Sequence, residues 1–164
     1  MKNAKTACIA LLVVVCLITL FIRIPLPSRG YFNVGDIAVV FSGLVLGFLA
    51  PGRGWLWAIA AGGVGSALAD ILGGFAMFAP LTFVAKSLEA GFAALAVSRS
   101  GFGHYLFLGL GGLGMVGGYF IGEVMMPNIG FQGAAAELLP NIIQAVGGAV
   151  GGRLTFAAYQ RVMK

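Results

Sequence analysis

Charged residues are scarce in this sequence. Of its 164 residues, 9% are charged and 60% are hydrophobic, and the mean hydropathy is +1.01. A soluble domain carries about 25% charged residues, and no soluble fold of this length can bury so much apolar surface. The composition therefore predicts an all-helical integral membrane protein in which residues 1–164 form a single compact bundle.

Residue types that carry enzyme chemistry are also few. The chain has one histidine, His104, and two cysteines, Cys8 and Cys16, which lie in one apolar segment. At that spacing the cysteines neither pair across a helix nor form a metal site. Motifs of metalloproteases, serine hydrolases and P-loop ATPases are absent. We therefore expect no enzyme activity, no ATP hydrolysis by this chain alone, no cofactor and no metal.

Apolar runs separated by polar or glycine-rich turns predict six transmembrane helices. We expect them at about 7–22, 35–50, 55–73, 81–97, 104–126 and 135–161. The first run follows two lysines, as in a signal peptide, but its length and the lack of a cleavage signal favour a membrane helix. The polar loop at 23–33 is either a lid over one end of the bundle or a plain connector.

Six spans place both termini on one side of the membrane, and the basic residues indicate which side. The N-terminal side carries Lys2, Lys5, Arg53, Arg99, Arg161 and Lys164, and the opposite side carries Arg23 and Arg29. Because cytoplasmic loops are enriched in Lys and Arg, this distribution predicts cytoplasmic termini. The net charge of +5 thus fits membrane orientation, and we expect a lipid bilayer and no nucleic acid as partner.

The polar residues within the spans gather in the outer half of the bundle. Glu137, Asn141 and Gln144 are spaced i, i+4, i+7 and form one stripe on a helix. Pro140 lies within this stripe and frees a backbone carbonyl. The other polar residues at this depth are Asp36, Asp70, Lys86 and Glu123. Because polar groups in apolar segments are costly unless they face protein, water or ligand, they predict a pocket for a small polar molecule.

Two alternatives explain the same residues without a small ligand. Asn and Gln side chains connect membrane helices, so the stripe could bind a partner helix in a membrane scaffold or assembly subunit. Lys86 could form a buried ion pair with Asp70 or Glu89. The pocket interpretation predicts instead that alanine at Lys86, Asn141 or Gln144 weakens ligand binding while the protein still folds.

Five sequence segments, taken together and in this order along the chain, resemble those of a known family. They are GYFNVGD at 30–36, GxGSALADxLGGF at 63–75, APLTFVAKSLEA at 79–90, GGYFIGE at 117–123 and GAAAELLPNIIQ at 133–144. Together they resemble the substrate-binding S component of energy-coupling factor (ECF) vitamin transporters. The similarity is to the branch that includes S components for the thiamine pyrimidine precursor, pyridoxine and riboflavin.

This resemblance implies a multi-pass subunit of a bacterial or archaeal cytoplasmic membrane that binds one water-soluble vitamin or precursor from outside. Its implied partners are a T-component membrane protein and two cytoplasmic ATPases, which supply the energy. In this family the loop between the first two helices closes over a pocket made largely by the last three. The polar positions of the motifs are matched by Asn33, Asp36, Lys86, Glu123, Asn141 and Gln144.

The first helix of this family often carries A-x-x-x-A, which docks the T component. Here the small residues Thr6, Ala7 and Ala10 predict the docking surface, because small side chains let another helix approach closely. Thr6 and Ala10 give the family spacing, whereas the alanines fall at 4, 7 and 10. Which pair docks is therefore open.

Overall fold

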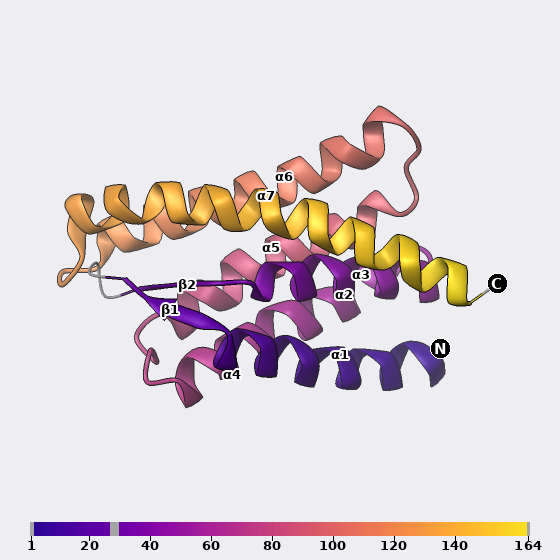
Figure 1. Cartoon of the computed structure of the whole chain (residues 1–164), viewed down its shortest axis with the longest axis horizontal. Coiled ribbons are helices and arrows are strands. Elements are labelled where there is room, and N and C mark those ends of the chain that lie inside the picture. The colour runs from indigo at the N-terminus through magenta and orange to yellow at the C-terminus, as the bar shows by residue number, and fades with distance from the viewer. Residues whose placement is uncertain (1, 27–29, 164) are drawn as a thin grey trace.

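The computed structural model describes residues 2–26 and 30–163. They form six helices and one short β-hairpin (Figure 1). The helices are α1 (Lys2–Phe21), α2 (Gly35–Leu49), α3 (Gly54–Ala58) continuing through the π-helical η1 (Ile59–Val64) into α4 (Gly65–Leu72), α5 (Ala79–Ala96), α6 (Phe102–Met125) and α7 (Gly130–Val162). For these residues the predicted all-α class is confirmed, apart from the hairpin.

The hairpin occupies the segment expected to be a loop. Strand β1 (Arg23–Pro25) pairs antiparallel with β2 (Tyr31–Asn33), so that Arg23 lies opposite Asn33. Strands of three residues are too short to show an alternating pattern in the sequence, which is why they were not predicted. Two basic residues of the charge count, Arg29 and Lys164, lie outside the described part of the chain.

Two helices are longer than predicted. Helix α1 begins at Lys2, not near residue 7, and α7 begins at Gly130, so the loop expected at 127–134 is mostly helical. The apolar run marks only the part of a helix that faces lipid or protein, and both helices extend beyond it. The other predicted helix ends lie within about two residues of the observed ones.

Helix α2 lies in the middle of the bundle, where it packs against α1, α5 and α7. Its contact with α7 is unusually close. A Cβ atom at Gly148 would lie 2.8 Å from the Cβ of Asp36, so only glycine allows this approach. The contact places the polar stripe of α7, which ends one turn earlier at Gln144, beside the N-terminal end of α2.

The outer surface of the bundle is strongly apolar. Exposed side chains include Leu113 on α6 and Val146, Val150 and Leu154 on α7, each more than half exposed. A surface of this kind fits contact with lipid. In the described part of the chain three helices are long and apolar enough to cross a membrane, namely Ala4–Phe21, Gly54–Leu72 and Phe102–Met125. Helix α2 is shorter, and buried polar residues lower the hydropathy of α5 and α7.

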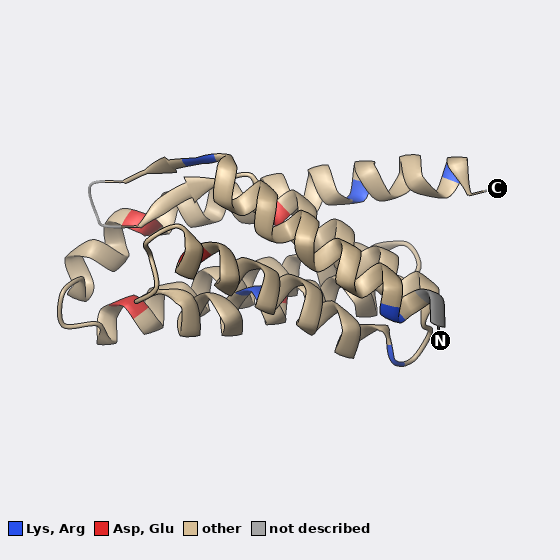
Figure 2. Ribbon diagram, turned by 90° about the horizontal axis from the view of Figure 1, so that it is seen from below, with Lys and Arg blue, Asp and Glu red and all other residues tan. Residues whose placement is uncertain are grey.

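The two termini lie at one end of the bundle and the hairpin at the other (Figure 1). Figure 2 shows most basic residues towards the end with the termini, whereas the acidic residues lie in the half that holds the hairpin. Because cytoplasmic loops are enriched in Lys and Arg, this distribution favours cytoplasmic termini, and the orientation in the membrane stays a prediction.

We expect a membrane-impermeant thiol reagent to distinguish the two ends on intact cells. Single cysteines are placed at Gln132 near the hairpin end and at Ser100 near the termini, both exposed, in a background without Cys8 and Cys16. Position 132 should be labelled and position 100 protected until the cells are lysed. Labelling of position 100 alone would reverse the proposed orientation.

Candidate functional site

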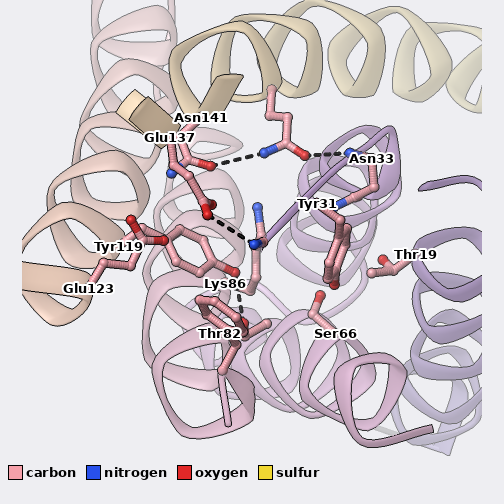
Figure 3. Close-up of a pocket in the computed structure, with 13 residues that line it drawn as sticks. Thr19, Tyr31, Asn33, Ser66, Thr82, Lys86, Tyr119, Glu123, Glu137 and Asn141 are labelled. Atoms are coloured by element: carbon pink, nitrogen blue, oxygen red, sulfur yellow. Dashed lines mark hydrogen bonds between the residues drawn. The ribbon is translucent and has the colours of Figure 1, made fainter. Parts of the chain in front are cut away.

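A polar cavity lies beneath the hairpin, between α4, α5, α6 and α7 (Figure 3). The residues that line it are Thr19, Gly30, Tyr31, Asn33, Ser66, Phe78, Thr82, Lys86, Tyr119, Glu123, Glu137, Asn141 and Gln144. The volume within which the centre of a water molecule can move is about 30 Å³. A single water needs at least about 10–15 Å³, so the polar cavity has room for roughly two.

Six of the eight residues predicted to bind substrate line this cavity. They are Asn33, Lys86, Glu123, Glu137, Asn141 and Gln144. The other two, Asp36 and Asp70, do not line the cavity but contact residues that do. Asp36 pairs with Lys86, and Asp70 accepts a hydrogen bond from Tyr31. The structure thus brings all eight together, although they come from five separate segments of the chain.

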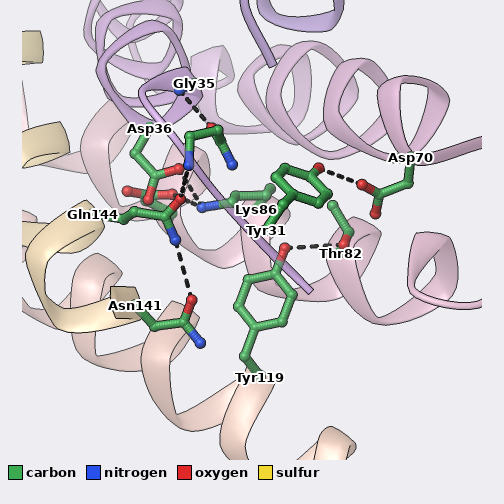
Figure 4. A network of polar contacts seen from close by, with 11 residues as sticks. Tyr31, Gly35, Asp36, Asp70, Thr82, Lys86, Tyr119, Asn141 and Gln144 are labelled. Atoms are coloured by element: carbon green, nitrogen blue, oxygen red, sulfur yellow. Dashed lines mark hydrogen bonds and ion pairs between the residues drawn. The ribbon is translucent and has the colours of Figure 1, made fainter. Parts of the chain in front are cut away.

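Lys86 connects α5 to α2 through a buried charge network (Figure 4). Its Nζ atom donates to Asp36 Oδ1 at 2.5 Å and to Glu89 Oε2 at 3.2 Å. All three side chains are buried. The ion pair with Glu89 was one of the two expected alternatives; the other, with Asp70, is not the pairing found. Two carboxylates surround one ammonium group, so the network carries one excess negative charge when all three groups are ionised.

The stripe on α7 holds the hairpin in place. Gln144 Oε1 accepts a hydrogen bond from the backbone N–H of Asn33 at 2.7 Å, and Gln144 Nε2 donates to Asn141 Oδ1 at 3.1 Å. Glu137 Oε1 accepts from the backbone N–H of Gly30 at 3.1 Å. Because the stripe is buried and faces the hairpin, a partner helix outside the bundle cannot reach it. This geometry argues against the scaffold interpretation.

A second set of contacts fixes the hairpin to the end of α4. The hydroxyl group of Tyr31 donates to Asp70, and Arg23 donates to the carbonyl of Gly73 at 3.1 Å. The guanidinium of Arg23 also lies 5.1 Å from the ring centre of Phe75. Burial, together with the nearby Asp70 carboxylate, raises the pKa of Tyr31 far above its ordinary value. Tyr31 therefore stays protonated and keeps donating.

Aromatic and hydroxyl side chains complete the wall of the cavity. Tyr119 donates to Thr82 Oγ1 at 2.9 Å, and the Lys86 ammonium lies 5.6 Å from the Tyr119 ring centre, within the range of a cation–π contact. The sequence interpretation did not single out Tyr119 or Thr82, nor five other lining residues, which are Thr19, Gly30, Tyr31, Ser66 and Phe78. Five of these seven residues lie within the segments that resemble the family, namely Gly30, Tyr31, Ser66, Thr82 and Tyr119. Their place in those segments was the only indication of a role that the sequence offered.

The predicted docking residues lie on α1, away from the cavity. Thr6 and Ala10 are exposed, whereas Ala7 is half-buried and packs against the core. The face that carries Thr6 and Ala10 continues with the exposed apolar residues Val13 and Leu17. Of the three predicted residues, Ala7 is therefore least able to meet a partner.

The similarity of this chain to known proteins covers almost its whole length. The family model described as ECF-type riboflavin transporter, S component, matches residues 1–161. A protein of Pyrococcus woesei described as "Uncharacterized protein in gap 3'region" is 38% identical over 149 residues, which cover 88% of this chain and 93% of that protein. No solved structure matches the chain. The family match includes every residue that lines the polar cavity.

Proposed function

Since this chain belongs to the family of ECF-type riboflavin transporter S components, we propose that its polar cavity binds a water-soluble vitamin or vitamin precursor from outside the cell. The substrate classes in view are the thiamine pyrimidine precursor, pyridoxine and riboflavin. The protein would be a multi-pass subunit of a bacterial or archaeal cytoplasmic membrane. A T component and two cytoplasmic ATPases would drive uptake.

The observation that carries this proposal is a buried polar cavity in an otherwise apolar bundle. Lys86, Glu123, Glu137, Asn141 and Gln144 are each at most 6% exposed and line one space. Burying so many polar groups is costly unless a ligand or a fixed partner satisfies them. A cavity roofed by a short hairpin is the kind of site that holds a small molecule away from bulk water.

The hairpin is proposed to act as the lid. The enclosed space is too small for a heteroaromatic ring, so binding requires the hairpin or the lining side chains to move. Two of the contacts that hold the hairpin use Glu137 and Gln144, which are also proposed to bind substrate. Hydrogen-bond donors of a ligand can replace the backbone N–H groups of Gly30 and Asn33. Lid opening and ligand binding would thus be coupled.

We expect Asn141→Ala and Gln144→Ala each to weaken binding of the substrate to the purified protein. Loss of a buried partner costs roughly 1–3 kcal/mol, or about 5- to 150-fold in affinity. Arg153→Ala is the matched control on the same helix, because Arg153 lies near the opposite end of α7 and outside the cavity. Isothermal titration calorimetry measures the three affinities. Normal binding by both stripe variants would show that these residues only connect helix and hairpin.

The energy for uptake is proposed to come from partner subunits. The chain carries no P-loop motif, so we expect binding without pumping when it is alone. The exposed face of α1 around Thr6 and Ala10 is the proposed contact with the T component. Small side chains at these two positions permit a close helix–helix approach.

A further inference from the structure

The acidic side chains of this protein are all buried near the polar cavity. The sequence contains five acidic residues. They are Asp36, Asp70, Glu89, Glu123 and Glu137, and none is more than 4% exposed. Among the described side chains Lys86 is the one buried base. Arg23 of the hairpin is a second, half-buried base in this region. Five carboxyl groups against two bases still give it more potential negative than positive charge (Figure 2).

The same region contains buried polar atoms without a hydrogen-bond partner among the described residues. They include the hydroxyl groups of Thr19 and Ser66, which line the cavity, and several carboxyl oxygens. Four carboxyl groups each have one buried oxygen without a hydrogen-bond partner among the described residues: Asp36 Oδ2, Asp70 Oδ2, Glu89 Oε1 and Glu123 Oε2. Lys86, the strongest donor, is already shared between two carboxylates. Of these four groups, Glu123 lines the cavity itself. A ligand that supplies donors would satisfy it.

Glu123 and Glu137 approach the cavity from neighbouring helices. Glu123 lies on α6 and Glu137 on α7, and Figure 3 shows both on the side of the cavity that also holds Tyr119 and Asn141. Tyr31 and Tyr119 add aromatic surface to the cavity wall. Two carboxyl groups beside aromatic faces form a favourable environment for a flat group that is positively charged.

We propose that the ligand is a small heteroaromatic molecule that carries an amino group or a positive charge, and that Glu123 and Glu137 bind this group. The inference rests on the proposed function and narrows its substrate class. A ring carbonyl cannot donate a hydrogen bond to these carboxyl groups, whereas an amino group can. An anionic ligand would be repelled by several carboxylates, and the repulsion is strong because the buried site has a low dielectric constant. Among the described residues no three His, Cys, Asp or Glu side chains converge as a metal site.

The experiment measures binding of matched compounds to the purified full-length protein by isothermal titration calorimetry. Pyridoxamine is compared with pyridoxine, which carries a hydroxyl in place of the amine. Thiamine and its aminopyrimidine precursor are compared with riboflavin and with the anion nicotinate. We expect at least one amino-bearing or cationic compound to bind about 10-fold or more tightly than every neutral or anionic one.

Two variants test whether Glu123 and Glu137 bind the amino or cationic group of the ligand. Glu123→Gln and Glu137→Gln keep the side-chain shape and should each weaken binding of the preferred compound by about 10-fold or more. Gln144→Ala serves as a comparison that removes a contact without changing charge. Each variant is first shown to be folded from the protection of its buried Cys8 and Cys16 thiols.

The possible outcomes separate this inference from the proposed function. Binding of only neutral or anionic compounds overturns the ligand class and leaves a vitamin-binding subunit. Unchanged affinity in both glutamine variants overturns the assignment of the two glutamates. If none of the compounds binds to the folded protein, the proposed function itself fails, and the ligand class fails with it.

Discussion

Replacing Lys86 with methionine is expected to destabilise the bundle by about 3–5 kcal/mol, because it leaves the buried carboxyl groups of Asp36 and Glu89 without their cation. The sequence alone predicts only weaker ligand binding for a change at Lys86. The structure adds that Lys86 joins α5 to α2. For a chain of this size the loss lowers Tm by roughly 10 °C.

The matched control removes the charges together. In the triple variant Lys86→Met, Asp36→Asn, Glu89→Gln no carboxylate is left unpaired, so most of the lost stability should return. Thermal unfolding in detergent can be followed with a thiol-reactive dye, because Cys8 and Cys16 are free and buried in the native fold. If the single variant unfolds at the wild-type temperature, the ion network does not stabilise the bundle.

Ala10→Trp is expected to abolish ATP-dependent uptake while leaving ligand affinity within a few-fold of wild type. Ala10 is exposed on α1 and does not line the polar cavity. An indole ring at this position would keep a second helix from approaching closely. Uptake is measured in vesicles that contain the co-expressed T component and ATPases, and affinity is measured on the purified chain.

Leu110→Trp is the control for a bulky residue on the outer surface. Leu110 is exposed on α6 and stands as many residues into its helix from the end with the termini as Ala10 does on α1. It should transport normally. Normal transport by Ala10→Trp, or accumulation of substrate by the chain without partners, would contradict the proposed division of labour between a binding subunit and an energy-supplying module.

The sequence predicted the helices well because each coincides with an apolar run. It also predicted which charged residues gather, since Asp36, Asp70, Lys86 and Glu123 stand out in segments where a charge is costly. It predicted the ion pair of Lys86 with Glu89 as one alternative, but not the pair with Asp36. Whether Lys86 meets Asp36 or Asp70 depends on how α2 and α4 pack against α5, and that packing is set by glycine contacts such as Gly148 against α2.

The sequence did not predict the hairpin or the tyrosine, serine and threonine side chains of the cavity wall. The two strands are short, and their register depends on contacts with α7 made more than a hundred residues away, such as Asn33 with Gln144. Tyrosine, serine and threonine are common in membrane helices and carry no charge. Residues such as Tyr119 and Ser66 therefore gave no signal of a cavity until the helices were placed together.

The central claim is that the polar cavity holds a small vitamin-like molecule, and the most direct test identifies that molecule. Protein purified from its membrane is denatured, and the released compounds are quantified by mass spectrometry for wild type, for the double variant Asn141→Ala, Gln144→Ala and for Leu110→Trp. We predict one heterocyclic compound at about one molecule per chain in wild type and Leu110→Trp, and strong depletion in the double variant. Equal amounts in all three proteins, or no stoichiometric compound in any, would contradict the account.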